Sequence, residues 1–260
     1  MKTLLFDLVD EQIGILTLHR PEVRNAINSQ MMQELLQFWQ NRVVDSGAIR
    51  CLILTGSSEL AFCAGADLKE RKNMDLKTWK KQHFILQQAM ISMVQCPIPI
   101  LAAVNGVAFG GGLELALACD FIYASKPATF SQSEVKLGIM PGAMGTQNLP
   151  RACGIRRAKE LSLTGQVFSS EQAYHWGIVN KICEPQDLMA EAINTARQIS
   201  ENAPCAIRQV KTAINASTHL DIFMGYALEV NAYRRLLLTK DREEGIAAFN
   251  EKRKPNFVGE

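Results

Sequence analysis

The chain has 260 residues, of which 47% are hydrophobic and 21% are charged, and its formal net charge at pH 7 is +2. These values are typical of an ordinary globular protein in water, and a nearly neutral charge gives no support for a nucleic-acid-binding surface. A chain of this length buries enough apolar surface to fold without disulfide bonds or a structural metal.

The cysteines are single and dispersed: there are seven, with no C-x-x-C pair among them. Such a set predicts reduced core thiols in a cytosol-like compartment. The four histidines are also isolated, so the spacing of a zinc site is missing. The opening segment "MKTLLFDLVDEQ" contains too short an apolar stretch for a signal sequence, and no apolar run reaches membrane-spanning length. We therefore expect a cytoplasmic protein without a metal site.

Strands and helices are predicted to alternate over residues 1–150. Two β-rich segments, "TLLFDLV" and "GILTLH", open the chain. After the loop "RPEVRNAINSQ", either Asn28 or Ser29 is expected to cap a helix. The apolar residues of this helix recur at every fourth position, as Met31, Leu35, Trp39 and Val43.

Two continuous apolar runs, "IRCLILTG" and "PIPILAAVNG", predict strands that are covered on both faces. A helix is expected between these runs, over residues 79–94. From Ile155 onward the pattern becomes mainly helical, with breaks at glycine and proline. Strands that alternate with helices, followed by a helical C-terminal part, indicate the α/β class.

The segment "NGVAFGGGLELALACD" places three consecutive glycines directly before an apolar helix. A helix start presents unpaired N–H groups and a partial positive charge, and glycine lets another molecule approach the backbone closely. This combination favours a site for a negatively charged oxygen. The alternative is that Gly110, Gly111 and Gly112 only allow the helix to pack tightly against a strand.

Two carboxylates and one further turn stand out beside this segment. Glu114 lies in the first turn of the helix between apolar neighbours, where an unpaired charge is costly unless it is paired, neutral or functional. Glu134 lies between a β-like stretch and a loop rich in glycine and proline, where sites are common. The alternatives are a helix-dipole contact at a solvated edge for Glu114 and an ordinary surface position for Glu134. In "LAFCAGADLKE", the turn before an expected helix start at Asp67 offers another backbone N–H.

Together these segments resemble the crotonase (enoyl-CoA hydratase/isomerase) superfamily. The matching motifs are "RPEVRNAIN", "FCAGADLKE", "AAVNGVAFGGGLELALACD", "FSQSEVKLGIMPGAMGTQ", "SSEQAYHWGIVNKI" and "DREEGIAAFNEKRKPNF", in the family order across essentially the whole chain. The resemblance implies a spiral of ββα units that forms nearly perpendicular sheets over residues 1–195. It also implies a helical C-terminal region over residues 196–260 that packs subunits into trimers, usually as hexamers.

The resemblance further implies an oxyanion hole for the thioester carbonyl of an acyl-CoA, formed by the backbone N–H groups of Ala66 and Gly111. Glu114 and Glu134 match both acidic positions of the hydratases in the superfamily, which implies enoyl-CoA hydratase activity of the fatty-acid β-oxidation type. Glu114 would activate water for attack at Cβ, and Glu134 would deliver the proton to Cα. CoA is then part of the substrate, and no separate cofactor is expected.

Two other functions remain open. One is different crotonase chemistry on an acyl-CoA, such as double-bond isomerisation, thioester hydrolysis or decarboxylation, which the loss of one glutamate would favour. The other is a non-catalytic scaffold or RNA-binding member, which degraded site residues or a basic run would favour. Since the sequence has both glutamates and no basic run, the expected partners are an acyl-CoA and further copies of the chain, without nucleic acid or membrane.

Contacts with CoA and with the acyl chain are also implied by the resemblance, some of them across a subunit boundary. The residues expected to bind the substrate are Arg24, Ala64, Ala66, Asp67, Leu68, Lys69, Gly111, Gly142, Phe249 and Lys252. For the basic residues among them, the alternative is a solvated face.

The loop "MPGAMGTQNL" departs from the common family pattern at two positions. Met144 replaces a glycine, and Asn148 replaces a frequent arginine. The methionine would either reshape the acyl pocket or point into the core. If the glycine of relatives has a positive φ, Met144 predicts a different local backbone.

Overall fold

The computed structural model describes residues 1–42 and 48–260, and this part of the chain contains two β-sheets. In spatial order, the first sheet consists of β1 (Leu4–Val9), β2 (Ile13–Leu18), β3 (Cys51–Gly56), β5 (Ile100–Val104), β7 (Phe121–Ser125) and β10 (Lys181–Cys183). The second consists of β4 (Ala61–Cys63), β6 (Val107–Phe109), β8 (Thr129–Ser131) and β9 (Val167–Ser169). Strands β4, β6 and β8 are parallel neighbours, so their carboxyl ends meet at one edge of the second sheet.

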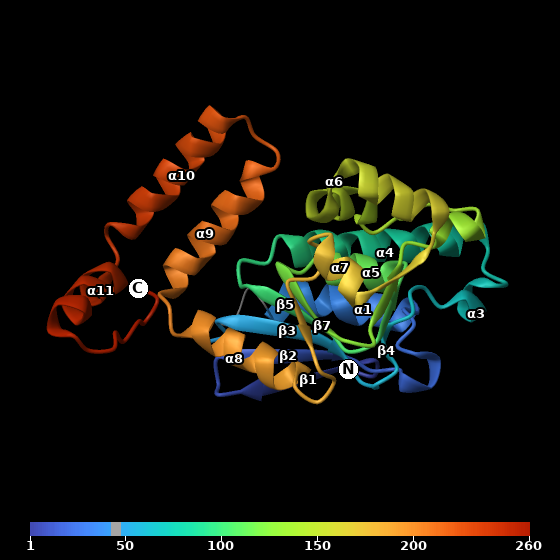
Figure 1. Cartoon of the computed structure of the whole chain (residues 1–260), viewed down its shortest axis with the longest axis horizontal. Coiled ribbons are helices and arrows are strands. Elements are labelled where there is room, and N and C mark those ends of the chain that lie inside the picture. The colour runs from blue at the N-terminus through green and yellow to red at the C-terminus, as the bar shows by residue number, and fades with distance from the viewer. Residues whose placement is uncertain (43–47) are drawn as a thin grey trace.

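Helices cover both faces of the first sheet (Figure 1). The helices packed on one face are α1 (Ser29–Gln37), α4 (Leu76–Val94) and α5 (Gly111–Leu117), and α8 (Leu188–Ser200) packs on the other. Along β5, Ile100, Ala102 and Val104 belong to the larger core, whereas Leu101 and Ala103 face α8. The prediction that the two continuous apolar runs form strands covered on both faces is therefore confirmed.

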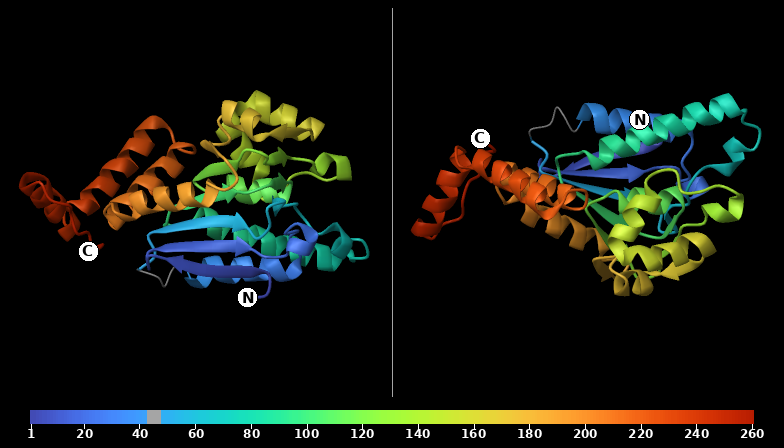
Figure 2. Two further views of the ribbon diagram at one scale, coloured as in Figure 1. Left: turned by 60° about the horizontal axis from the view of Figure 1, so that its bottom comes forward. Right: turned by 90° about the horizontal axis from the view of Figure 1, so that it is seen from above.

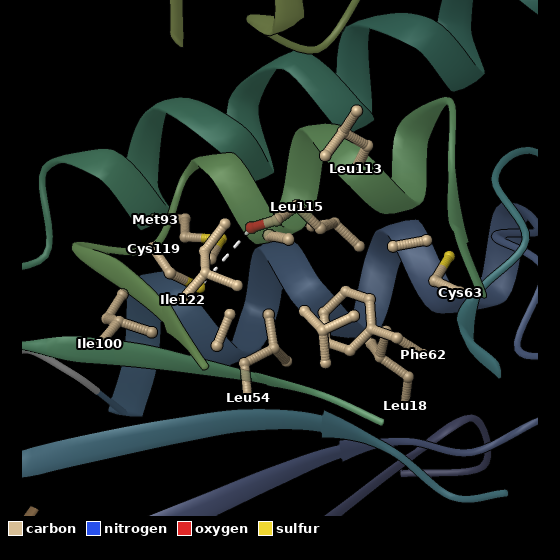
Figure 3. Packing of buried hydrophobic residues seen from close by; sticks show 14 of the residues in the cluster. Leu18, Leu54, Phe62, Cys63, Met93, Ile100, Leu113, Leu115, Cys119 and Ile122 are labelled. Carbon is tan, nitrogen blue, oxygen red and sulfur yellow. Dashed lines mark hydrogen bonds between the residues drawn. The ribbon is translucent and has the colours of Figure 1, made fainter. Parts of the chain in front are cut away.

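The larger core lies between the first sheet and helices α1, α4 and α5 (Figure 3). In this close view, Leu54 and Ile100 of the sheet lie opposite Met93 of α4 and Leu115 of α5. Because these side chains are excluded from water, each contributes about 1.5–3 kcal/mol to folding through burial. This core fixes the start of α5, and with it the glycine segment, against the rest of the molecule.

The first predicted helix forms as expected. Asn28 is its N-cap, since its side chain accepts a hydrogen bond from the amide of Met31 at 2.9 Å. Met31, Leu35 and Trp39 are buried, and Val43 lies outside the described residues. After Gln37 the helix continues as a π-helical segment, η2 (Phe38–Arg42).

Glu34 of α1 attaches the N-terminal strand to this helix. Its buried carboxylate accepts hydrogen bonds from the amides of Lys2 and Thr3 at 2.6 and 2.8 Å, from the Thr3 hydroxyl at 2.7 Å and from Gln30 at 2.8 Å. Burial alone would raise the pKa of Glu34, but these hydrogen bonds outweigh it and lower the pKa to about 2.

We expect Glu34→Gln to lower the free energy of unfolding by about 2–3 kcal/mol at neutral pH, because an amide cannot accept all the bonds made to the charged group. A depressed pKa means that this stabilisation is present above the unfolded-state pKa and is lost as the pH falls towards about 2. Urea unfolding at several pH values measures it. Glu59→Gln, at an exposed position, is the matched control, and equal stability of the two variants at pH 7 would contradict the assignment.

The part after Ile155 is mainly helical, as expected, but it also contains two short strands that were not predicted. Strands β9 and β10 interrupt it, and each is three residues long, too short to produce a period in the sequence. Its helices are α6 (Gly145–Thr164), α7 (Ser170–His175), α8, α9 (Pro204–Ser217), α10 (Ile222–Leu236) and α11 (Lys240–Glu251).

Helices α9, α10 and α11 extend away from the sheets, as Figures 1 and 2 show in three orientations. The division at residues 195/196 falls within α8, whose Leu188, Ala192 and Ala196 pack on the first sheet. The nearest break between helices is at residues 201–203, between α8 and α9, and the division into two regions stays a prediction. None of the described helices combines the length and the apolar character of a membrane span.

Candidate active site

Three segments leave the carboxyl ends of the parallel strands β4, β6 and β8, and they build one site. The segment after β4 carries Ala66, the segment after β6 leads to Gly111 at the start of α5, and the segment after β8 carries Glu134. Carboxyl ends of parallel strands are a common place for ligand sites because neighbouring loops converge there. Residues that are far apart in sequence therefore meet at one edge of the second sheet.

The amides of Ala66 and Gly111 lie next to each other. A β-carbon built on Gly111 would lie 4.0 Å from the Ala66 nitrogen and 3.9 Å from Cα of Gly65. Two backbone hydrogen bonds hold this turn. The N–H of Ile27 donates to the Gly65 carbonyl, and the N–H of Asp67 donates to the Ile27 carbonyl. Among the described residues, neither the Ala66 nor the Gly111 amide has a hydrogen-bond acceptor. The pair is free to bind one oxygen atom.

Each of the three glycines meets a different requirement. Gly110 has a φ of +51° and a ψ of −120°, and a β-carbon there would lie 3.0 Å from Glu134 Oε1. Gly112 packs so closely on β4 that a β-carbon would lie 2.1 Å from the Cys63 carbonyl oxygen. Gly111 lies between them and lines the cavity described below. The close packing at Gly112 confirms one explanation of the glycine run, and the binding of an oxygen by the unpaired amide of Gly111 stays a prediction.

Glu114 is buried in the first turn of α5, with 3% of its surface exposed. Its Oε1 accepts hydrogen bonds from the amides of Ala143 and Gly145, both at 2.8 Å. Burial raises the pKa of Glu114 to about 7, opposed by these two hydrogen bonds and assisted by the charge of Glu134. A carboxylate with a pKa near neutrality can exchange protons at physiological pH.

Met144 lies between the two amides that bind Glu114, and it adopts the left-handed conformation with a φ of +71°. The methionine therefore takes a positive φ itself, and a local backbone different from that of relatives stays a prediction. This turn directs the amides of Ala143 and Gly145 to one side, which is the arrangement that binds anions. Neither Met144 nor Asn148 lines the cavity, so the structure gives them no contact with an acyl chain.

Gln132 is hydrogen-bonded to the second carboxylate and lies near the first. It is fully buried, and its Nε2 donates a hydrogen bond to Glu134 Oε1 at 3.0 Å. The Oε1 atoms of Gln132 and Glu114 lie near one point beside Gly145. A β-carbon built on Gly145 would lie 2.9 Å from the Gln132 oxygen and 2.8 Å from the Glu114 oxygen. Gln132 Oε1 and Glu134 Oε2 have no partner among the described residues. Burial raises the pKa of Glu134 too.

A cavity of about 800 Å³ is lined by the two acids and by the residues that carry the two unpaired amides. Of the residues expected to form the site, those that line it are Ala64, Ala66, Leu68, Gly111, Glu114, Glu134 and Gly142. Two buried acids and two unpaired amides therefore lie on one cavity of a size that suits an organic ligand.

The family model described as "Enoyl-CoA hydratase/isomerase" matches residues 9–260. The chain belongs to the enoyl-CoA hydratase/isomerase family. It is 37% identical to the crotonyl-CoA hydratase of Syntrophomonas wolfei, over 96% of this chain and 95% of that protein. It is 42% identical to the enoyl-CoA isomerase/hydratase fer4 of Mycosarcoma maydis, over 94% of this chain and 92% of that protein.

Among solved structures, an enoyl-CoA hydratase from Bacillus anthracis is similar over the full length of both chains, with a TM-score of 0.97 and 39% identity. The crotonase resemblance and the crotonase-like α/β fold with C-terminal helices are thus confirmed. The family includes proteins named as hydratases and as isomerases, so membership alone does not select the reaction.

Three residues that were predicted to contact CoA do not line the cavity: Arg24, Asp67 and Lys69. The Asp67 carboxylate caps α3 (Leu68–Arg71) and pairs with Arg20 at 2.8 Å, which holds the turn that carries Ala66, and the contact of Asp67 with CoA stays a prediction. The side chains of Arg24 and Lys69 are exposed. The Arg24 carbonyl accepts a bond from the Ala64 amide at 3.0 Å, which places it beside the cavity but not on its wall.

Phe249 and Lys252 lie on and just after α11, in the helical extension, and also do not line the cavity. The structure of one chain therefore does not bring them to the substrate. Phe249 is 84% exposed, which is unusual for a phenylalanine and leaves it available to another copy of the chain. Their contact with substrate stays a prediction for the assembled protein.

Three residues of the site were missed at the sequence level: Gln132, Arg71 and His83. Gln132 stands two residues before Glu134, but both lie after the end of β8, so no strand period predicts that their side chains meet. Arg71 and His83 line the cavity from α3 and α4, and His83 Nε2 lies 3.2 Å from the Gly142 carbonyl. No local pattern connects these positions with the glycine segment.

The raised pKa of Glu114 has a consequence for stability. A folded-state pKa above the unfolded value means that stability is lost as the pH rises from about 4.5 to about 7. The loss approaches about 3 kcal/mol, since one pKa unit corresponds to about 1.4 kcal/mol. Glu114→Gln has no charge to desolvate, so its stability relative to the unmodified protein should increase over this range.

Chemical denaturation of both proteins at about pH 4.5 and about pH 8 measures this difference. Glu160→Gln, at an exposed position on α6, is the control and should show no such gain. A constant stability difference between the Glu114 variant and the unmodified protein at both pH values would show that burial does not shift this group.

Proposed function

We propose that the protein is an enoyl-CoA hydratase, which adds water reversibly to a 2-trans-enoyl-CoA to give a 3-hydroxyacyl-CoA. The observation that carries the proposal is the presence of two buried carboxylates, Glu114 and Glu134, on one cavity beside the amides of Ala66 and Gly111. Hydration requires a base for the attacking water, an acid for Cα and a donor for the thioester oxygen. These four residues supply all three functions.

In the proposed reaction, the thioester oxygen accepts hydrogen bonds from Ala66 and Gly111 as negative charge develops on it. A preorganised donor of this kind contributes about 3–4 kcal/mol to lowering the barrier. Ionised Glu114 takes a proton from water as its oxygen attacks Cβ, and protonated Glu134 gives its proton to Cα. The Nε2 of Gln132 then donates a hydrogen bond to the ionised form of Glu134.

The reaction balances without a separate cofactor, since the proton that Glu134 gives is matched by the proton that Glu114 receives. We propose that CoA enters only as part of the substrate. The single, mostly buried cysteines support placing this reaction in the cytoplasm, and we assign it to fatty-acid β-oxidation.

We further propose that the chain assembles as a trimer or as a hexamer built from two trimers. Large apolar side chains are exposed on the extension, including Ile222, Phe223 and Leu238 at 79%, 82% and 93%. Such side chains are usually covered in an oligomer. Sedimentation analysis should give a mass of three or six chains, and a monomer at micromolar concentration would contradict this part of the proposal.

Loss of the conjugated enoyl-thioester absorbance on mixing the protein with a series of 2-enoyl-CoAs tests the function. Turnover of at least one of them is expected. Double-bond isomerisation is the second candidate, because the relative from Mycosarcoma maydis is named as an isomerase/hydratase. A 3-enoyl-CoA incubated with the protein distinguishes the two: an isomerase would convert it without any activity on the 2-enoyl-CoAs, and that result would exclude the hydratase proposal.

A further inference from the structure

Arg71 is the only arginine or lysine among the described residues that line the cavity. It is the last residue of α3 and is half-buried, whereas its neighbours Lys69 and Lys72 are exposed to solvent. No described carboxylate forms a salt bridge with it. Glu70, which is adjacent in sequence, instead accepts hydrogen bonds from Gln82 and from the Ser29 amide.

The guanidinium of Arg71 is held in one orientation from two sides by α4. Its Nε donates a hydrogen bond to Oε1 of the buried Gln82 at 3.2 Å. Its Cζ lies 4.7 Å from the centre of the Trp79 ring. Gln82 is itself fixed, because its Nε2 donates to Glu70 and to Ser29 at 2.8 Å each.

This arrangement uses the face and the Nε of the guanidinium and leaves both terminal nitrogens without a partner among the described residues. Two parallel N–H donors on a fixed planar group match a carboxylate in a bidentate pair. Burial lowers the pKa of Arg71, with the charge of Glu70 opposing the shift, which agrees with a cation that lacks a full counter-charge.

The neighbouring wall of the cavity carries polar groups beside apolar side chains such as Leu86. Trp79, His83 and Gln87 follow one another at intervals of four on α4 and all line the cavity. A purely hydrocarbon acyl chain would remove water from these groups without replacing its hydrogen bonds, which is unfavourable. An acyl chain that ends in an anionic group would replace them.

We propose that Arg71 binds a carboxylate at the far end of the acyl chain, so that the preferred substrates are 2-enoyl-CoAs derived from dicarboxylic acids. The inference rests on the proposed use of this cavity for an acyl-CoA but not on the hydration step. Arg71 touches the substrate in this proposal, and Gln82 and Trp79 are positioning residues. The phosphates of CoA are the other source of anionic charge, and the exposed Lys69 and Lys72 are better placed to meet groups that stay hydrated.

Calorimetric titration with glutaryl-CoA and pentanoyl-CoA tests the proposal, because both thioesters are unreactive, have acyl chains of equal length and differ in the terminal carboxylate. The unmodified protein should bind glutaryl-CoA more tightly. Arg71→Met should weaken glutaryl-CoA binding by about ten- to hundredfold, the range for hydrogen bonds to a charged group, and leave pentanoyl-CoA binding unchanged. Lys72→Met, with the same change of charge at an exposed position, should affect neither.

Two results would overturn the proposal. Equal weakening of both thioesters by Arg71→Met would assign Arg71 to the CoA part, and no weakening of either would leave it a solvated residue. If Arg71→Met does not fold, Arg71→Lys decides, since it keeps the charge but loses the paired donors and should still reduce the preference for glutaryl-CoA. Because binding alone is measured, a lack of hydratase activity would contradict the proposed function without affecting this result.

Discussion

Replacement of Glu134 by glutamine should reduce the rate constant for hydration of crotonyl-CoA by about a hundredfold to ten-thousandfold, the range for a general acid or base. Glutamine is nearly isosteric and keeps the contact with Gln132, but it has no proton to give to Cα. The Michaelis constant should change little, because the oxyanion donors Ala66 and Gly111 remain. Steady-state rates measured from the absorbance of the enoyl thioester check this.

Glu114→Gln should cause a loss of similar size for a different reason, since an amide cannot take a proton from water. The double variant should be only slightly worse than either single one, because the two acids act together in one addition reaction and their effects are not additive. Exposed Glu160 provides the control variant, Glu160→Gln, which should retain full activity. Full hydratase activity in the Glu134 variant would exclude that residue as the acid.

Gly110→Ala should abolish most of the hydratase activity although it replaces neither of the two acids. The backbone of Gly110 has a positive φ, and the new β-carbon would lie 3.0 Å from Glu134 Oε1. Alanine is strained in this conformation, and relief of the contact moves the acid. A displacement of about 1 Å can reduce a rate by about a hundredfold. We expect a reduced rate constant together with reduced thermal stability.

Gly154→Ala separates these two effects. Gly154 also has a positive φ, but no atom lies within 4 Å of its added β-carbon. It should therefore lose stability through backbone strain and keep its activity. Comparison of the melting temperature and the rate constant of both variants tests the assignment, which fails if Gly110→Ala is no less active than Gly154→Ala.

The sequence allowed the site's reacting groups to be predicted because each carries a local signal. Glu114 combines a charge with apolar neighbours, and Gly111 stands at a helix start, so both could be recognised without knowledge of the fold. Strands β3 and β5 were also predictable, because continuous apolar runs occur where both faces of a strand are buried.

The surroundings of these groups could not be predicted, because they come from distant segments. The amides that bind Glu114 belong to Ala143 and Gly145, and only the packing of α6 against α5 brings them there. The cation Arg71 is oriented by Trp79 and Gln82 of another helix. Short strands such as β9 left no period, and the role of Asp67 depends on its pairing with Arg20.

The hydrogen bonds from Ala143 and Gly145 to Glu114 tie the strength of the base to the shape of the binding site. The loop that carries both amides follows directly after residues 138–142, which form part of the cavity wall. Any change that widens this wall for a bulkier acyl chain also moves the donors that set the proton affinity of the base. Leu86 and Gln87 of α4 also line the cavity and, within the described residues, make no such bond to either acid, so directed evolution of acyl preference at a constant turnover rate should begin there.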